Sequence, residues 1–146
     1  MKMMAFSCRQ DEREFFEQFG KQYGVEVETT REAPSMENAG LLKGCGAACV
    51  LTTPVAADLI DRWHEYGVKL ISTRTVGFEH VDYRHAAKLG IVVSNATYTP
   101  DTVAEYTIMT ILMAIRKMKI ILQRYIGQDF SLRHVRGREL GPMTVG

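Results

Sequence analysis

The chain has 146 residues, of which 46% are hydrophobic and 24% charged, and its formal net charge is +1. This composition is ordinary for a globular domain, and the near-neutral charge argues against a nucleic-acid-binding protein, which would present a basic face. The N-terminus lacks the apolar core of a signal peptide, no stretch approaches the ~20 apolar residues of a membrane span, and three cysteines without a secretory signal indicate reduced thiols in the cytoplasm.

Apolar runs alternate with amphipathic runs through residues 1–100. The predicted strands lie at residues 2–7, 25–30, 47–53, 68–73 and 91–96. The predicted helices lie at residues 11–24, 35–44, 54–67 and 81–90. Because parallel strands need a crossover that is usually a helix, this alternation predicts an α/β fold with a doubly wound, parallel, five-stranded sheet.

Local signals refine three of these elements. An apolar face of the first helix is predicted from aromatic residues at helical spacing: Phe15, Phe16, Phe19 and Tyr23. Residues 25–30 alternate between apolar and polar side chains, which is typical of a strand near the edge of a sheet. Thr53 and Pro54 are a hydroxyl cap followed by proline, and this pair predicts that the third helix begins there.

The character of the sequence changes after Pro100. No glycine or proline interrupts residues 101–126, so the pattern predicts one continuous helix of about 39 Å. Acidic residues lead this helix and basic residues end it, which suits the helix dipole. Its apolar residues form more than one stripe and need burial on two sides, whereas the preceding sheet can cover only one. We therefore expect a homodimer that forms through residues 101–126.

The last four residues resemble the start of a strand. Met143, Thr144, Val145 and Gly146 follow polar turn residues and are typical of the opening of a buried strand. A single strand has no sheet to complete, so the pattern indicates a larger protein of which this chain is a part.

The positions of possible ligand contacts follow from the predicted strands. In an open parallel sheet, ligands bind beyond the carboxyl ends of the strands. These positions are Cys8 and Arg9, then residues 53–55, 74–80 and 95–99. Gly77 would let backbone approach an anion, and Tyr98 precedes a helix N-terminus, which together indicate a pocket for a small carboxylate. The alternative remains open that Gly77 only turns the chain and that Tyr98 is a half-exposed loop aromatic.

Other motifs do not form a site. The segment "GCGAAC" at residues 44–49 precedes a predicted strand, whereas a dinucleotide fingerprint follows one and opens a helix. Cys45 and Cys49 have no matching His or Cys pair, so no metal site is predicted. His80 is interpreted as a surface loop residue, and the basic residues 133–138 are interpreted as a solvated loop. No complete hydride-transfer or hydrolytic site is present.

Four segments resemble one enzyme family in order along the chain. They are "MAFSCRQDE" at residues 4–12, "STRTVGFEHVD" at 72–82, "GIVVSNATYTPDTVAEYTIMTILMAIRK" at 90–117 and "GRELGPMTVG" at 137–146. The chain is similar in these segments to the D-isomer-specific 2-hydroxyacid dehydrogenases, in particular to their D-lactate dehydrogenase branch. The resemblance implies a flavodoxin-like substrate domain at residues 1–100. It also implies that residues 101–146 form a hinge and dimerisation helix and then begin a truncated NAD-binding Rossmann domain.

The resemblance also implies roles for particular residues. Loop backbone at Val76 and Gly77 would hold the substrate carboxylate together with Tyr98, and Arg9 would be a further substrate-binding residue. Thr102 and Val103 would start the helix that runs beside the nicotinamide of NAD. Pro54 and Val55 would line the pocket for the substrate side chain. The family's catalytic arginine, glutamate and histidine match no residue here, so no catalytic residue is assigned.

Two functions compete at this stage. The first is an NAD-dependent D-2-hydroxyacid dehydrogenase that reversibly reduces a 2-keto acid to a D-2-hydroxy acid, of which this chain would be an N-terminal fragment that is inactive alone. The second is a stand-alone, non-enzymatic flavodoxin-like module that dimerises through its long helix.

Overall fold

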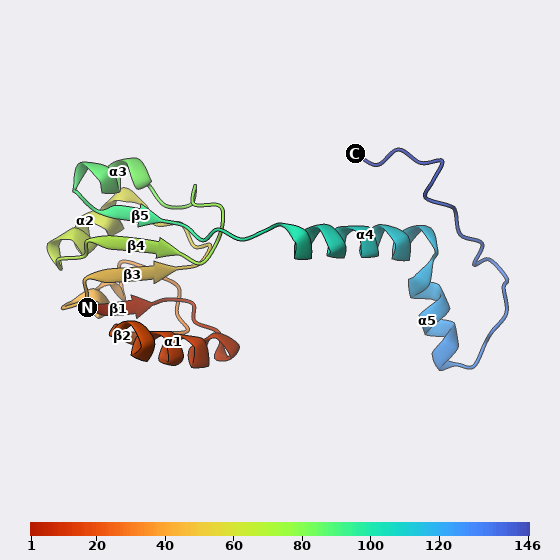
Figure 1. Cartoon of the computed structure of the whole chain (residues 1–146), viewed down its shortest axis with the longest axis horizontal. Coiled ribbons are helices and arrows are strands. Elements are labelled where there is room, and N and C mark those ends of the chain that lie inside the picture. The colour runs from red at the N-terminus through yellow and green to blue at the C-terminus, as the bar shows by residue number, and fades with distance from the viewer. The chain divides into compact units, whose positions relative to one another are not determined.

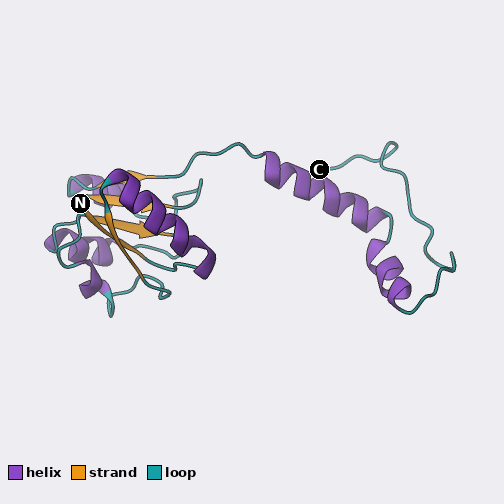
Figure 2. Cartoon of the chain, turned by 60° about the horizontal axis from the view of Figure 1, so that its bottom comes forward, coloured by secondary structure: helices purple, strands orange, loops and turns teal.

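The computed structural model describes all residues, 1–146, and the chain divides into two compact units, Met1–Tyr98 and Thr99–Gly146. The first unit contains all five strands, and the second contains two helices and an irregular tail. Figure 1 shows the elements in chain order, and Figure 2 shows the loops that join them. No helix is both long enough and apolar enough to cross a lipid bilayer.

The sheet of the first unit is parallel throughout, with strands in the order β2-β1-β3-β4-β5. The strands are β1 (Lys2–Ala5), β2 (Glu26–Thr29), β3 (Ala47–Val50), β4 (Leu70–Thr73) and β5 (Val92–Ser94). This is the flavodoxin-like order, and it confirms the predicted fold class. Strand β2 lies at the edge, as its alternating sequence predicts, whereas β3 is buried along its whole length.

The helices lie on both faces because the chain changes direction in the sheet. The connection from β1 to β2 runs one way, and the later connections run the other way, so right-handed crossovers place α1 opposite the remaining helices. These elements are α1 (Gln10–Tyr23), the 3₁₀ helix η1 (Ala39–Leu42), α2 (Ala57–Glu65) and α3 (Tyr83–Lys88).

The core lies between one face of the sheet and the helices α2, α3 and η1 that cover it. Trp63 of α2 is fully buried and stacks on Phe6, with ring centroids 5.9 Å apart. Met4, Val50 and Ile71 add strand side chains to the same cluster. All members of this cluster belong to residues 4–93, so the first unit has a complete core of its own.

Helix α2 begins three residues later than predicted. Pro54 is exposed loop, and Val55 forms an isolated bridge with Val81 before the helix starts at Ala57. The N–H of Val55 donates to the carbonyl of His80 at 2.8 Å. The Thr53–Pro54 signal was therefore wrong, because pairing with a distant segment holds these residues extended and overrides the local helix-start pattern.

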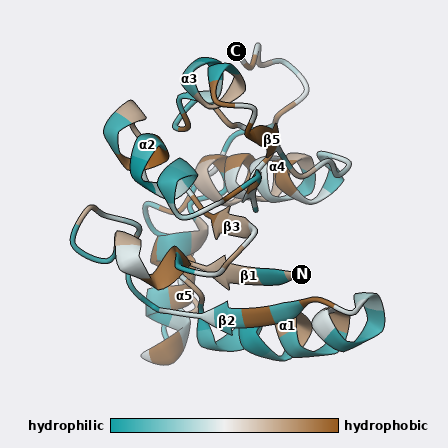
Figure 3. Ribbon diagram, turned by 90° about the vertical axis from the view of Figure 1, so that its left-hand side faces the viewer, coloured by the Kyte–Doolittle hydropathy of each residue, from teal (hydrophilic) through white to brown (hydrophobic).

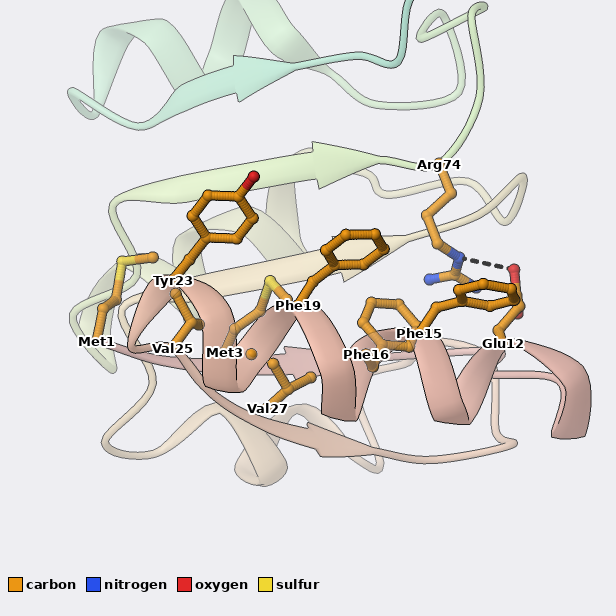
Figure 4. Close-up of a pocket in the computed structure, with 11 residues that line it drawn as sticks. Met1, Met3, Glu12, Phe15, Phe16, Phe19, Tyr23, Val25, Val27 and Arg74 are labelled. Atoms are coloured by element: carbon orange, nitrogen blue, oxygen red, sulfur yellow. Dashed lines mark ion pairs between the residues drawn. The ribbon is translucent and has the colours of Figure 1, made fainter.

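Helix α1 leaves most of its aromatic face uncovered. Gly20 is the buried residue of α1, and a Cβ there would lie 2.7 Å from the carbonyl oxygen of Val25, just before β2. Phe15, Phe19 and Tyr23 stay exposed and line an apolar groove of about 420 Å³ between α1 and the sheet (Figure 4). The predicted apolar face exists, but the described chain does not cover it.

The second unit contains α4 (Asp101–Ile115) and α5 (Met118–Ile126) instead of one helix over residues 101–126. The helical conformation is interrupted at Lys117, which has a left-handed backbone with φ of 56°. The carbonyl of Ile115 accepts the N–H of Arg138 at 3.0 Å, where a continuous helix would use a residue four positions on. Competition from the returning tail, which no local pattern reveals, is the physical reason that the continuous helix was wrong.

The tail contains no strand. Residues 143–146 are irregular and mostly exposed, with Val145 58% exposed. The strand predicted at Met143 is absent from this structure because no neighbouring strand is present for it to pair with.

Candidate functional site

The loops that follow β1, β3, β4 and β5 meet at one edge of the sheet. Strands β1 and β3 are neighbours whose connections lead in opposite directions, so a switch point lies between their carboxyl ends. In this fold class the switch point is where small ligands bind. The structure brings the predicted residues of the first unit, Arg9, Val76, Gly77 and Tyr98, to loops at this edge.

The loop after β4 presents backbone donors. The carbonyl of Val76 accepts from Nδ2 of Asn95 at 2.7 Å, and the carbonyl of Gly77 accepts from Oγ1 of Thr75 at 2.6 Å. The N–H groups of Val76 and Gly77 have no acceptor within the chain. Both peptide carbonyls are thus tied to the protein while two adjacent N–H groups stay available, an arrangement suited to an anion.

A carboxylate of the chain lies close to the same loop. Glu79 accepts the N–H of Phe78 through Oε2 at 2.9 Å, and a Cβ on Gly77 would lie 3.0 Å from that oxygen. Because Gly77 has no side chain, the space beside its backbone stays open. A larger residue at this position would crowd the Glu79 side chain.

Arg9 is the residue before α1, and Glu12 holds its backbone. The N–H of Arg9 donates to Oε2 of Glu12 at 2.9 Å, which is one half of a capping box. The Arg9 side chain is 65% exposed, with Nη2 3.4 Å from Oε1 of Glu12 and Nε 3.5 Å from Oδ1 of Asp11. Its guanidinium therefore keeps most of its surface available to solvent or to a ligand.

Arg74 spans the switch point. Its Nη2 donates to the carbonyls of Phe6 at 2.9 Å and Ser7 at 3.0 Å, both at the end of β1. Its Nη1 lies 3.5 Å from Sγ of Cys49 on β3. Its Nε lies 3.3 Å from Oε1 of Glu12 in an ion pair without hydrogen-bond alignment (Figure 4).

Burial controls the chemistry of the thiol beside Arg74. Cys49 is 4% exposed, and this burial raises the pKa of its thiol above the ordinary value, although the hydrogen bond from Arg74 acts in the opposite direction. A thiol with a raised pKa is a poor nucleophile at neutral pH. Cys49 is thus a packing residue of the site rather than a reactive one.

The remaining predicted contacts of the first unit differ in exposure. Tyr98 is 63% exposed, and no hydrogen bond holds its hydroxyl. Val55 is 1% exposed and belongs to the core, so its side chain does not line an open pocket, whereas Pro54 is exposed. Of the two residues predicted beside the substrate side chain, only Pro54 is accessible in this structure.

Thr102 and Val103 lie in the first turn of α4, in the second unit, and both are exposed. Gly44 and Gly46 lie before β3, so they do not form the turn from a strand into a helix that binds pyrophosphate. No three His, Cys, Asp or Glu side chains lie together as a metal site would need.

Sequence patterns did not single out the residues that hold the loops together. Arg74 lies within the predicted ligand-facing segment 74–80, but its carbonyl partners are 67 and 68 residues away in the chain. Asn95 and Thr75 act on carbonyls of the β4 loop in the same way. The signal available was their place at the ends of strands, which gives an edge of the sheet but not a partner.

Comparison with known proteins agrees with this fold. The profile of the D-isomer specific 2-hydroxyacid dehydrogenase family, catalytic domain, matches residues 3–130. The match covers most of the chain, and the chain belongs to this family. The resemblance found in the sequence segments is thereby confirmed.

The chain is similar to several individual members of the family. It is 37% identical over its whole length to a D-specific alpha-keto acid dehydrogenase of Enterococcus faecalis and covers 46% of that protein. It is 32% identical to a D-lactate dehydrogenase of Lactiplantibacillus plantarum and covers 45% of it. Among solved structures, the apo D-lactate dehydrogenase of Escherichia coli is similar with a TM-score of 0.83 and 28% identity, over 94% of this chain and 45% of that one. The chain thus spans about half the length of the relatives that it matches.

Proposed function

We propose that the chain forms the substrate-binding portion of an NAD-dependent D-2-hydroxyacid dehydrogenase that reversibly reduces a 2-keto acid. In this proposal residues 1–100 are the substrate domain. Residues 101–146 are the hinge and dimerisation segment that leads into the NAD-binding domain, and the chain alone is catalytically incomplete. Membership of the family supports the reaction class, and the match to only about half of each relative supports incompleteness.

The observation that carries the proposal is the pair of unpaired donors in the β4 loop. A 2-keto acid has a carboxylate that must be held while its carbonyl reacts. The N–H groups of Val76 and Gly77 can donate to that carboxylate without first breaking bonds within the chain. Tyr98 and Arg9 add a hydroxyl and a guanidinium at the same edge of the sheet, and the guanidinium matches a carboxylate in geometry and charge.

NAD is the proposed cofactor, and a relative from Lacticaseibacillus paracasei is an NAD⁺-dependent D-2-hydroxyacid dehydrogenase. The nicotinamide, when bound, would supply the hydride that reduces the keto carbon. We propose that the pyrophosphate is held outside residues 1–146; the position of Gly44 and Gly46 before β3, and not in a turn from a strand into a helix, supports this. Thr102 and Val103 are proposed to contact the nicotinamide side of the cofactor.

We further propose a cytoplasmic homodimer that forms through residues 101–126. Helices α4 and α5 support this proposal with apolar side chains that remain exposed, among them Ile108, Met109, Leu112, Ile121 and Leu122. Figure 3 shows hydrophobic residues, in brown, on α4. Exposed apolar surface of this extent favours association.

The proposal is tested by titrating the ¹⁵N-labelled chain with pyruvate and following backbone amides by NMR. We expect the amide signals of Val76 and Gly77 to shift with pyruvate and to stay unchanged with pyruvamide, which is similar in shape but lacks the carboxylate charge. The same chain mixed with NADH and pyruvate should show no turnover. Amides at residues 76 and 77 that ignore pyruvate would contradict the proposed site, and turnover would contradict incompleteness.

A further inference from the structure

We propose that Arg74 is a positioning residue of this site: it fixes the loop after β1 and, through Glu12, sets the place of Arg9. This inference rests on the proposed function, because it assigns Arg74 a role in binding the carboxylate of a 2-keto acid. Arg74 itself is directed into the protein and does not act as a ligand.

The Arg74 side chain joins several elements of the fold. Arg74 leaves the end of β4 and reaches Phe6 and Ser7 after β1, Cys49 on β3, and Glu12 on α1. Its side chain is 15% exposed, so these contacts form with limited competition from water.

Stacking adds a further restraint. The Arg74 guanidinium carbon lies 5.6 Å from the centre of the Phe16 ring on α1. A planar group that donates in several directions and stacks on an aromatic ring is fixed more firmly than a lysine ammonium would be. The position of α1 relative to β4 therefore depends on this side chain.

The loop that Arg74 holds has a strained backbone. Ser7 has φ of 50°, a left-handed conformation that costs free energy for a residue other than glycine. Three hydrogen bonds hold this loop. The N–H of Ser7 donates to the backbone carbonyl of Glu32 and the N–H of Cys8 to that of Thr30, each at 2.8 Å, and the carbonyl of Ser7 accepts from Nη2 of Arg74. Of these three bonds, the one from Arg74 is donated by a side chain and comes from the end of β4.

Arg74 and Arg9 share Glu12. One carboxylate pairs with partly buried Arg74 through Oε1 and accepts the Arg9 N–H through Oε2. The Glu12 side chain is 17% exposed, whereas the Arg9 side chain is 65% exposed. The partly buried pair therefore restrains the carboxylate, and the carboxylate in turn restrains the start of α1 and the backbone of Arg9.

The test is a double-mutant cycle on the complete 146-residue chain, read by the pyruvate titration. Arg74→Lys keeps the charge but loses the multiple donor geometry, and Arg9→Gln removes the proposed carboxylate contact. We expect each to weaken pyruvate binding about tenfold, the scale of a lost charge-assisted hydrogen bond. If Arg74 acts through Arg9, the double variant should also be about tenfold weaker, rather than about a hundredfold.

Two further variants separate positioning from loss of fold. Glu12→Met removes both acceptors while leaving the carbonyl bonds of Arg74, and should weaken pyruvate binding to the same extent as Arg74→Lys. Arg13→Met removes an exposed pair with Glu17 on the same helix and should leave binding unchanged. For every variant, amide spectra should overlay with those of the unmodified chain except at the substituted residues, their sequence neighbours and the residues that they contact.

The outcomes are distinct. Unchanged affinity in Arg74→Lys or Glu12→Met, or additive losses in the cycle, would overturn the positioning role while leaving the carboxylate site in place. An unmodified chain whose Val76 and Gly77 amides ignore pyruvate would overturn the site itself and the positioning role with it. Non-additive loss together with a binding-competent parent chain supports the proposal.

Discussion

At the scale of single residues, the site depends on groups that burial keeps neutral or fixed. Cys49 is one of these, because it is buried on β3, its thiol lies beside the Arg74 guanidinium, and burial raises the pKa of that thiol. The folded chain therefore holds the Cys49 proton more tightly than the unfolded chain does. Folding stability must then fall as the pH rises from the pKa of an unfolded thiol toward the higher pKa of the folded one.

We predict that the free energy of unfolding decreases above about pH 8.5, where thiols in an unfolded chain ionise. Cys49→Ala should make the slope of stability against pH smaller in this range, whatever its effect at neutral pH. Cys45 accounts for part of the remaining slope, since burial also raises its pKa. Urea denaturation at a series of pH values measures the slope. An identical slope in Cys49→Ala would show that this thiol is not linked to folding.

The residue scale is also where sequence reasoning reached its limit. Val76 and Gly77 could be proposed from the strand pattern and the family resemblance, because these two signals are carried by residues that are neighbours in the sequence. The partners of Arg74 could not, since Phe6 and Ser7 come close only when β1 and β4 lie in one sheet. The burial of Val55 had the same origin, because its bridge to Val81 depends on a segment that follows β4.

At the scale of elements, local signals predicted the type of most helices and strands in residues 1–100 better than their ends. The exception is the helix predicted at residues 35–44, where the structure has only the 3₁₀ helix η1. Helix α1 ends at Tyr23, and Gly24 follows with φ of 65°, as a glycine cap predicts. The break between α4 and α5 was not predictable, because it coincides with contacts from the tail. Lys117 donates through Nζ to the carbonyl of His134 at 3.2 Å, and Gly137 lies so near that a Cβ would be 2.8 Å from the carbonyl oxygen of Ile115.

We predict that Lys117→Gly preserves or increases the stability of the second unit. Glycine adopts a left-handed backbone without the cost of about 1–2 kcal/mol that other residues incur, and this gain offsets the loss of the exposed Nζ bond. The matched control is Gln123→Gly, which places glycine inside α5 and should destabilise that helix by about 1 kcal/mol. Thermal denaturation followed by circular dichroism at the helical band compares the two variants. Equal loss of helix in both would mean that residue 117 is helical in solution.

At the scale of the whole molecule, the two units differ in how their stability arises. The first unit has a contiguous core of aromatic and aliphatic residues that includes fully buried Trp63 and Phe6. The second unit has a single buried residue, Val135, and its helices α4 and α5 have 15 and 9 residues. Isolated helices shorter than ~12–15 residues are marginal in water, so the second unit has little stability of its own without further surface to pack against.

We therefore predict that residues 1–98 fold alone and that residues 99–146 do not. The shorter fragment should keep the dispersed amide spectrum and the cooperative thermal unfolding of the complete chain, because every member of the core cluster lies within it. The fragment of residues 99–146 should have low helicity at micromolar concentration. Its helicity should rise with protein concentration if α4 and α5 bury their apolar side chains by self-association. A fragment of residues 1–98 that unfolds without cooperativity, or a fragment of residues 99–146 that is fully helical as a monomer, would show that stability is not divided between the units as their cores indicate.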